Sequence, residues 1–414
     1  LANHPPPRAK ASNSTVGRSR LVEIRVADLA KWGRFGSGKG VILSFLPRES
    51  SKVGQSMGRF AKNSSRISVA PMMEWTDRHY RFMARLLSPK VWLYTEMIHA
   101  RAVIHGDRPR LLGFDPVENP LALQLGGENP SQMAEAGRIG EDWGYDEINI
   151  NCGCPSDRVA SGSFGACLMA APEQVGHIVS AMKKALSIPV TVKCRIGIDG
   201  REDYAHLKDF SNRIIDAGCD RIIVHARIAV LGGLSPAENR TIPPLRYNDV
   251  YRLKDEFSDT PIEINGGIRT MEEIRKHYAG ALDGVMIGRA AYENPWILTG
   301  IEDVLSESPR SERQGLAIKP DLPGAPDLFD VIDRMNQYII ESFDRGVPAN
   351  AIARHMLGLM HGRPGAREFR RKLSGDWSRK LTDSRILGDY LESVRANAMQ
   401  AGIRQARLLE SVAN

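Results

Sequence analysis

Two cysteines lie close together in the stretch NCGCP, and the second of them, Cys154, is the first candidate for chemistry in this chain. A residue that precedes proline has a restricted backbone, so the direction of the Cys154 thiol is fixed. Such a thiol can act as a proton donor or as a nucleophile. The alternative is a small buried hydrophobic side chain, the usual state of a cysteine outside a disulfide. We adopt that alternative for the other cysteines: Cys152, Cys167, Cys194 and Cys219.

Polar groups in otherwise apolar runs form a second set of candidates. Lys193 lies in VTVKCR, His225 in IIVHAR and Gln124 in LALQLGG. A buried lysine needs an acceptor or an anion to offset the cost of its desolvation, and an internal ion pair or a bound molecule would each provide one. If the partner is a bound molecule, these three side chains suit the polar edge of a planar cofactor such as a flavin.

Two glycine-containing turns form a third set, Asn265-Gly266-Gly267 and Gly288-Arg289. Glycines let backbone N–H groups approach an anion closely, and an arginine at a helix start adds a forked donor. Glycines also turn tight corners without any ligand, so each turn alone is weak evidence. Together with Arg289 they predict a site for a phosphate-bearing cofactor, and the ribityl phosphate of a flavin mononucleotide would meet that need.

The elements that position these residues are short β-rich runs that alternate with segments of helical spacing. This alternation predicts right-handed βαβ units and a parallel sheet. Eight units in about 230 residues predict an α/β fold, the (β/α)₈ TIM barrel, whose functional groups lie at the carboxyl ends of the strands. A doubly wound open sheet is the alternative, but no G-x-G-x-x-G follows the first run. The runs are 67–71, 91–96, 121–126, 147–151, 189–195, 220–227, 261–266 and 284–289.

The remainder of the chain divides by composition. We expect the barrel over 66–305, a polar Pro/Gly-rich linker over 306–326 and a small all-α helical bundle over 327–414. Residues 1–65 are rich in Arg and Ser and show no periodicity. They are either an organelle transit peptide or a poorly ordered extension, in which case Met57 is a candidate start. The absence of a long apolar run predicts no membrane span. Five cysteines without a C-x-x-C pair predict no metal site and a reducing compartment.

The net charge of +7 is unevenly distributed. Residues 1–65 contain 12 Lys/Arg against 3 Asp/Glu, and residues 351–380 contain 8 against 2, so the segment 66–350 between them has a net charge of −8. The second basic zone includes Arg367, Arg370 and Arg371, whose spacing places them on one helical face. Such a face either binds phosphates or is merely solvated. The pattern indicates an anionic partner for the C-terminal region.

Taken together, the motifs of this chain resemble those of the tRNA-dihydrouridine synthases. The resemblance extends from about residue 66 into the C-terminal region. The stretch 233–245 resembles the A-type subfamily, and 354–371 resembles its C-terminal helical domain. The motifs are APMMEWTDRHYR, TEMIHARAVIHG, ALQLGG, NINCGCPSDRV, GACLM, TVKCRIGID, VHAR, GGLSPAENRTIPPL, INGGI and MIGRAAYENPW.

The resemblance implies a flavin enzyme that reduces uridines 20 and 20a in the tRNA D-loop to 5,6-dihydrouridine. FMN is its cofactor and NADPH its reductant; hydride passes from reduced FMN to uracil C6, and Cys154 supplies the proton to C5. Asn151 would hydrogen-bond the flipped base or support the Cys154 loop. The implied FMN contacts are Pro71, Met72, Met73, Gln124, Lys193, His225, Asn265, Gly266, Gly267, Gly288 and Arg289.

The implied tRNA contacts are Asn151, Arg240, Arg367, Arg370 and Arg371, together with Ala237, where the subfamily is expected to carry a basic residue. We expect a cytoplasmic monomer, or an organellar protein if the N-terminal segment is a transit peptide. Two rivals remain at this stage. One is a flavin barrel enzyme that acts on a small substrate, and the other is an RNA-binding module without catalysis.

Overall fold

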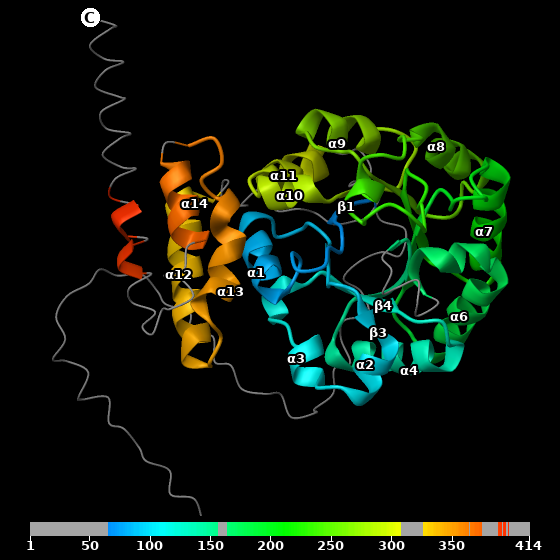
Figure 1. Cartoon of the computed structure of the whole chain (residues 1–414), viewed down its shortest axis with the longest axis horizontal. Helices are drawn as coiled ribbons and strands as arrows, with labels where there is room; N and C mark the ends of the chain where they lie inside the picture. Colours follow the sequence, from blue (N-terminus) through cyan, green and yellow to red (C-terminus); the bar gives the residue numbers. More distant parts are fainter. Residues whose placement is uncertain are drawn as a thin grey trace, which may run out of the picture. The chain divides into compact units, whose positions relative to one another are not determined.

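The computed structural model describes residues 65–155, 164–307, 326–363, 365–374, 388–390, 392–394 and 396. A parallel sheet forms the centre of the molecule (Figure 1). Its strands are β1 Arg66–Val69, β2 Leu93–Tyr94, β3 Ile98–His99, β4 Leu121–Gly126, β5 Glu147–Cys152, β6 Val190–Arg195, β7 Arg221–His225, β8 Ile262–Asn265 and β9 Gly284–Ile287.

The sheet closes on itself. Its strands follow the order β1-β9-β8-β7-β6-β5-β4-β2, every pairing is parallel, and β1 returns to the β2 region through a bridge between Ser68 and Trp92. The predicted (β/α)₈ barrel is therefore confirmed, and the doubly wound open sheet is excluded.

One predicted strand differs from the structure. Of the run 91–96 only Leu93–Tyr94 forms a strand, β2, and a further short strand, β3, follows beyond the predicted run at Ile98–His99, so the described residues form nine strands instead of eight. The cause lies at Thr95, whose hydroxyl accepts a hydrogen bond from the backbone N–H of Gln124 at 3.0 Å. A side chain thus takes the place of a backbone acceptor, and the regular ladder is interrupted there.

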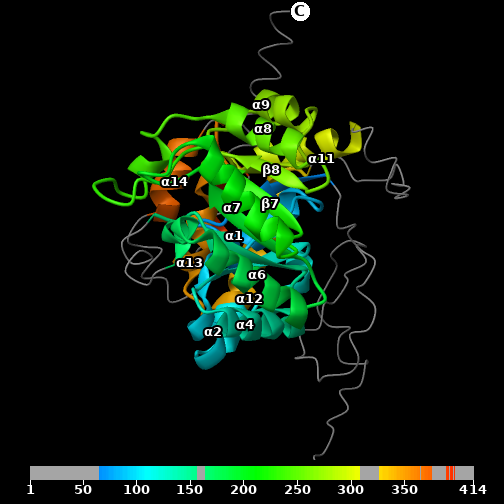
Figure 2. The same ribbon diagram turned by 90° about the vertical axis from the view of Figure 1, so that its right-hand side faces the viewer.

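Helices form an outer ring around the strands (Figure 1, Figure 2). They are α1 Arg78–Leu87, α2 Ala100–His105, α3 Arg108–Leu112, α4 Pro130–Trp143, α6 Pro172–Ala185, α7 Tyr204–Asp216, α8 Tyr247–Glu256, α9 Met271–Tyr278, α10 Arg289–Glu293 and α11 Ile297–Glu307. No helix within the described residues is long and apolar enough to cross a membrane.

Side chains alternate between the two faces of each strand, as a pleated backbone requires. On β5, Ile148 and Ile150 join the hydrophobic core between strands and helices. The intervening Asn149 and Asn151 face the barrel interior, where both side chains form hydrogen bonds with Gln124. The polar residues of β5 are therefore the inward half of that strand.

Three of the four cysteines predicted to be core residues are confirmed as such, because Cys152, Cys194 and Cys219 are buried. Cys167 is the exception. It is only partly buried, and its thiol donates to the carbonyl of Phe164 at 2.9 Å in the short 3₁₀ segment Gly165–Ala170.

The C-terminal region is helical where the structure describes it. It comprises α12 Leu328–Asp344, α13 Ala349–Ala353 and α14 Ala366–Ser374, which lie beside α1 in Figure 1. After α13 the chain winds into a 3₁₀ turn at Arg354–Gly358. Residues 1–64, most of the proposed linker and most of the predicted bundle after residue 374 lie outside the described residues.

The carboxylate of Asp77 is one of the polar links between the barrel and this helical region. Asp77 caps α1 by accepting from the N–H groups of His79 and Tyr80 at 2.9 and 3.1 Å. It also accepts from Arg354 at 2.5 Å and from His355 at 3.0 Å, and these two consecutive residues reach it from the 3₁₀ turn. The start of α1, and with it the loop after β1, is thereby anchored to the C-terminal helices.

Candidate active site

The carboxyl ends of β5 to β8 bring the predicted site residues to one end of the barrel, which we call the mouth. Parallel register pairs Asn151 with Lys193, and His225 with both Arg195 and Asn265. All five occupy inward positions of neighbouring strands. The grouping that the sequence predicted from strand ends is therefore formed, although the role of each residue stays a prediction.

The backbone around Cys154 is held by hydrogen bonds on both sides. The side-chain oxygen of Asn151 accepts from the N–H groups of Gly153 and Cys154, both at 3.0 Å. The guanidinium of Arg195 donates to the Gly153 carbonyl at 3.1 Å, and the N–H of Ala166 donates to the Cys154 carbonyl at 2.9 Å. The Cys154 backbone is thus fixed, and Asn151 performs the loop-supporting role of the two expected for it.

Sequence analysis did not select Arg195 as a site residue. Besides the Gly153 carbonyl, it donates to the carbonyls of Ile228 at 2.9 Å and Asn239 at 2.8 Å, so it ties the loops after β5 and β7 together. The signal was present, because Arg195 lies two positions after Lys193 and two residues along a strand share one face.

Lys193 has no acceptor among the residues that the structure describes, and it is only partly exposed. Burial, followed by the charge of Arg195, lowers its pKa to about 8. Burial and the charges of Arg195 and Lys193 hold the pKa of His225 well below its ordinary value, so this imidazole is neutral at pH 7. A partly buried lysine without an acceptor is the feature expected where a ligand supplies one.

The turn after β8 has a backbone that admits no side chains. Gly266 and Gly267 have φ angles of +112° and +74°, in the left-handed region that glycine favours. A Cβ on Gly266 would lie 2.5 Å from Cδ2 of His225. The hydroxyl of Tyr247 donates to the Gly266 carbonyl at 2.7 Å and fixes the turn. Asn265 instead donates its side-chain amide to the Met286 carbonyl at 2.8 Å, which links β8 to β9.

The turn after β9 lies against the loop after β1. A Cβ built on Gly288 would be 3.8 Å from the sulfur of Met72, and Arg289 begins α10 with its guanidinium 3.3 Å from the Arg240 carbonyl. Pro71 and Met72 are partly exposed here, and Met73 is exposed. The strand 1, 8 and 9 residues predicted to contact FMN therefore line one side of the mouth.

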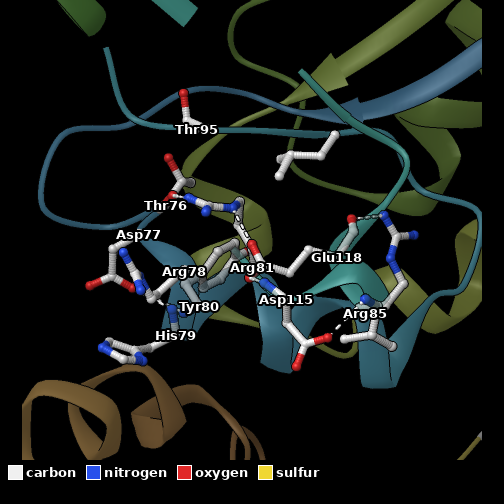
Figure 3. Close-up of polar contacts among 12 residues, drawn as sticks. Thr76, Asp77, Arg78, His79, Tyr80, Arg81, Arg85, Thr95, Asp115 and Glu118 are labelled. Carbon is white, nitrogen blue, oxygen red and sulfur yellow. Dashed lines mark hydrogen bonds and ion pairs between the residues drawn. The ribbon is translucent and has the colours of Figure 1, made fainter. Parts of the chain in front are cut away.

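The loop after β1 is held in place by side-chain hydrogen bonds at Thr76. Thr76 accepts from the Met72 N–H at 3.0 Å through its hydroxyl, and its carbonyl accepts from Arg81 at 2.7 Å. Arg81 is itself fixed by a buried ion pair with Glu118 at 2.7 Å, and Figure 3 shows Arg81 between these two partners.

The predicted tRNA contacts fall into two separate places. Ala237 and Arg240 lie exposed on the loop after β7. On α14 the arginines Arg367, Arg370 and Arg371 are exposed, whereas Phe369 and Leu373 on the same helix are buried. Within the part of the chain described, no ion pair neutralises these three arginines, and no hydrogen bond joins α14 to the mouth.

A closed α/β barrel that brings a cysteine loop, a lysine without an acceptor among the described residues and a left-handed glycine turn to one mouth has the architecture of the TIM-barrel enzymes. Residues 68–392 match the family model described as dihydrouridine synthase (Dus). The chain belongs to the dihydrouridine synthase family, flavin-dependent oxidoreductases that reduce uridines in tRNA. This membership confirms the resemblance and disfavours both rivals.

Several curated relatives are similar over most of the chain. A tRNA-dihydrouridine(20/20a) synthase of Synechocystis sp. is 51% identical over 335 residues, which cover 81% of this chain and 94% of the relative. Enzymes of the same name from Xanthomonas campestris and Pseudomonas aeruginosa are 51% and 47% identical; they cover 75% and 80% of this chain and 88% and 95% of their own lengths. These names agree with the A-type resemblance of residues 233–245.

Proposed function

We propose that this chain reduces uridines 20 and 20a of tRNA to 5,6-dihydrouridine, with FMN as its cofactor and NADPH as its reductant. The observation that carries the proposal is the juxtaposition, at one barrel mouth, of the fixed Cys154 loop with Lys193, which has no acceptor among the described residues. The positions 20 and 20a come from the names of the relatives, which this chain matches over most of its length.

The mouth has the donors that an FMN molecule needs. Arg289 and the left-handed turn of Gly266 and Gly267 would hold the phosphate, and Lys193 would donate to the acceptors of the ring. His225, neutral and buried against Gly266, would offer an N–H without adding charge. With FMN held by these residues, the hydride for uracil C6 would come from the flavin after its reduction by NADPH.

Cys154 would donate the proton that completes the reduction at C5. A general acid must be protonated before it acts and must be held within reach of the reacting atom. Among the described side chains of the mouth we take Cys154 and Lys193 as the two candidate donors, because His225 is held neutral. The loop that contains Cys154 is held by Asn151 and Arg195, and Lys193 is suited to stabilise the negative charge that develops on the uracil.

The tRNA would be bound at a second place as well. The exposed arginines of α14 would contact phosphates, and Arg240 would contact RNA from the loop after β7. Because the target uracil must leave its stack to reach the mouth, these contacts would hold the RNA while the base is flipped. Ala237 supplies no charge to this surface, so the loop relies on Arg240.

Two measurements test the proposal. The purified full chain should show the absorption bands of a flavin. After reduction by NADPH, tRNA should reoxidise this flavin, whereas a free pyrimidine should not. In a strain that lacks its own enzyme for uridines 20 and 20a, expression of the chain should restore dihydrouridine at these two positions, as mapped by mass spectrometry of tRNA fragments. A colourless protein, or restoration at other uridines only, would contradict it.

A further inference from the structure

A continuous column of buried side-chain hydrogen bonds runs through the barrel interior and ends at the Cys154 loop. Every member is at most 9% exposed. Thr191 donates to Glu147 at 2.6 Å, and Asn149 donates to the Thr191 hydroxyl at 2.8 Å. Gln124 donates to Asn149 at 2.7 Å, and it accepts from the residue that holds the loop, Asn151, at 2.8 Å.

The column is a product of strand register. Gln124 on β4, Asn149 on β5 and Thr191 on β6 are register partners, and all three are inward positions of adjacent strands. Asn151 is two residues further along β5 and therefore faces the same interior. The column thus crosses three strands and rises from the closed end of the barrel to its mouth.

The direction of every hydrogen bond in the column is set from both ends. Glu147 is paired with Arg66 at 2.6 Å, and an ionised carboxylate can only accept. The Thr191 hydroxyl must therefore donate its proton to Glu147. The oxygen of this hydroxyl is then free to accept from the side-chain amide of Asn149. At the other end the N–H groups of Gly153 and Cys154 can only donate, so the oxygen of Asn151 must face them.

The two amides between these ends have one arrangement that satisfies both. Gln124 gives its N–H to Asn149 and offers its oxygen to Asn151, and reversing either amide would place two donors or two acceptors together. Since the column is buried, each mismatch would leave an unsatisfied polar atom without water to replace the partner. The orientation of Asn151 is therefore coupled to a hydroxyl three links away.

We propose that Thr191 and Asn149 are positioning residues that fix the Cys154 loop through Gln124 and Asn151, with Glu147 as the terminal acceptor. The column itself is independent of any cofactor, whereas its consequence for proton donation rests on the proposed function. Gln124 then has a structural task in addition to its predicted contact with the flavin, because both ends of its amide are engaged within the column.

The test compares three variants of the full-length holoenzyme. Thr191→Val keeps the shape but removes the hydroxyl, and Thr191→Ser keeps the hydroxyl. Tyr94→Phe is the matched control, because the Tyr94 hydroxyl also donates to Glu147, at 3.0 Å, yet it lies outside the column. Melting temperature shows that each variant is folded.

The first readout is amide hydrogen exchange of the peptide that contains residues 150–155. In Thr191→Val the N–H groups of Gly153 and Cys154 should exchange at least about tenfold faster, because their acceptor is no longer held in one orientation. Thr191→Ser and Tyr94→Phe should match the wild type. Unchanged protection in a folded Thr191→Val protein would overturn the proposal, and so would equal deprotection in Tyr94→Phe.

The second readout is reoxidation of the reduced flavin by tRNA, measured beside its reduction by NADPH. We expect reoxidation in Thr191→Val to be about tenfold slower, since small misplacements of a reacting group cost large factors in rate. Reduction by NADPH should be unchanged. Faster amide exchange with a normal reoxidation rate would confirm that the column holds the loop but overturn its part in proton donation. A Cys154→Ala protein with a normal rate would instead count against the proposed function.

Discussion

The two ends of the barrel interior both contain buried cationic side chains. At the closed end these cations are paired with carboxylates, whereas at the mouth Lys193 is not paired with any described residue. At the closed end Arg66 binds both Glu147 and Glu263, and Arg221 lies 3.2 Å from Glu263. Burial lowers the pKa of Arg66, yet the two carboxylates outweigh burial and raise it. At the mouth, burial is not offset in this way, and the pKa of Lys193 falls to about 8.

The difference separates stability from function. A buried charge with its partners stabilises the fold only modestly, but removing one partner leaves the other exposed to the full cost of burial. A charge kept without a partner costs stability and persists where a ligand completes it. The closed end is therefore complete in itself, whereas under the proposed function the mouth would be completed by cofactor and RNA. Variants of the two ends should accordingly affect different measurements.

The largest effect is expected from Cys154→Ala at the mouth. Flavin reoxidation by tRNA should slow by about 10²–10⁴, the usual contribution of a positioned general acid. Melting temperature, flavin content and reduction by NADPH should stay near the wild-type values, because the contacts of this residue that hold the loop are made by its backbone.

The matched control for this variant is Cys167→Ala, since Cys167 is the other partly buried cysteine nearby in the chain. It should reoxidise at the wild-type rate. If Cys154→Ala reoxidises normally, the proton comes from elsewhere, and Lys193→Met then becomes the variant to test.

The second largest effect is expected at the closed end, from Glu263→Gln. Glu263 is fully buried, accepts from Ser68 at 3.0 Å and neutralises both Arg66 and Arg221. Loss of its charge should lower the free energy of unfolding by about 3–5 kcal/mol, as measured by denaturant titration. In the protein that remains folded, the rate of reoxidation by tRNA should be unchanged.

An exposed ion pair provides the control for Glu263→Gln. Glu256, at the end of α8, pairs with Arg252 and Lys208, and Glu256→Gln should leave the denaturant midpoint near the wild-type value, because exposed ion pairs contribute little to stability. Equal losses of stability in the two variants would show that the buried charges of the closed end contribute no more to stability than an exposed ion pair.

How far the sequence predicted these two ends depends on sequence distance. The strand ends, the glycine turns and the cysteine loop are local patterns, and the structure brings them to one mouth as expected. The pairing of inward groups is not local. Gln124 meets Asn149 only because β4 and β5 adopt one register, so its engagement inside the barrel could not be read from LALQLGG.

Long-range partners were missed for the same reason. The contact of Arg354 with Asp77 spans 277 residues, and no periodicity within either segment indicates the other. Arg195 was overlooked although its inward position followed from that of Lys193, because its acceptors are carbonyls of other loops. The split between β2 and β3 depends on a single hydroxyl, that of Thr95, which propensity does not register.

A smaller effect is expected on α14, where Arg367, Arg370 and Arg371 have no ion-pair partner among the described residues. If the comparison holds, Arg367→Ala/Arg370→Ala should alter binding and not stability. Each lost phosphate contact lowers the slope of log affinity against log salt by up to about 1, so the double variant should lose up to about 2. Binding of tRNA at low salt should weaken by about tenfold or more, as measured by filter binding or anisotropy.

Glu368→Gln is the control for the α14 variant, because it changes the charge of the same helix in the opposite sense. It should leave the salt slope unchanged or raise it slightly. Wild-type affinity and slope in the double variant would show that α14 only stabilises the helical region and that the RNA path lies elsewhere.

The smallest effect is expected at the joint between the barrel and the C-terminal helices, where charges are paired as at the closed end. Burial lowers the pKa of His79 from 6.5 to about 4, and its ring bonds to the Tyr338 hydroxyl at 2.9 Å. Burial raises the pKa of Asp77, but the hydrogen bond and charge of His355 outweigh it and hold that pKa well below its usual range.

Both shifts have the same sign for stability. Between pH 6.5 and 4 the unfolded chain takes up a proton at His79 that the folded chain refuses, so stability falls as the pH falls. Asp77 adds a further loss below its ordinary pKa of 3.8, where only the unfolded carboxyl is protonated.

His79→Gln removes the loss of stability that is due to His79. Between pH 7 and 4.5 the wild type should therefore lose about 1–2 kcal/mol more stability than this variant, or a few degrees of melting temperature. Flavin content at pH 7 should be the same in both proteins, since the charged groups at the joint are paired with one another and not with groups at the mouth. Parallel pH profiles would mean that His79 titrates normally in the folded protein, and a loss of flavin in His79→Gln would mean that the joint is coupled to the mouth through the loop after β1.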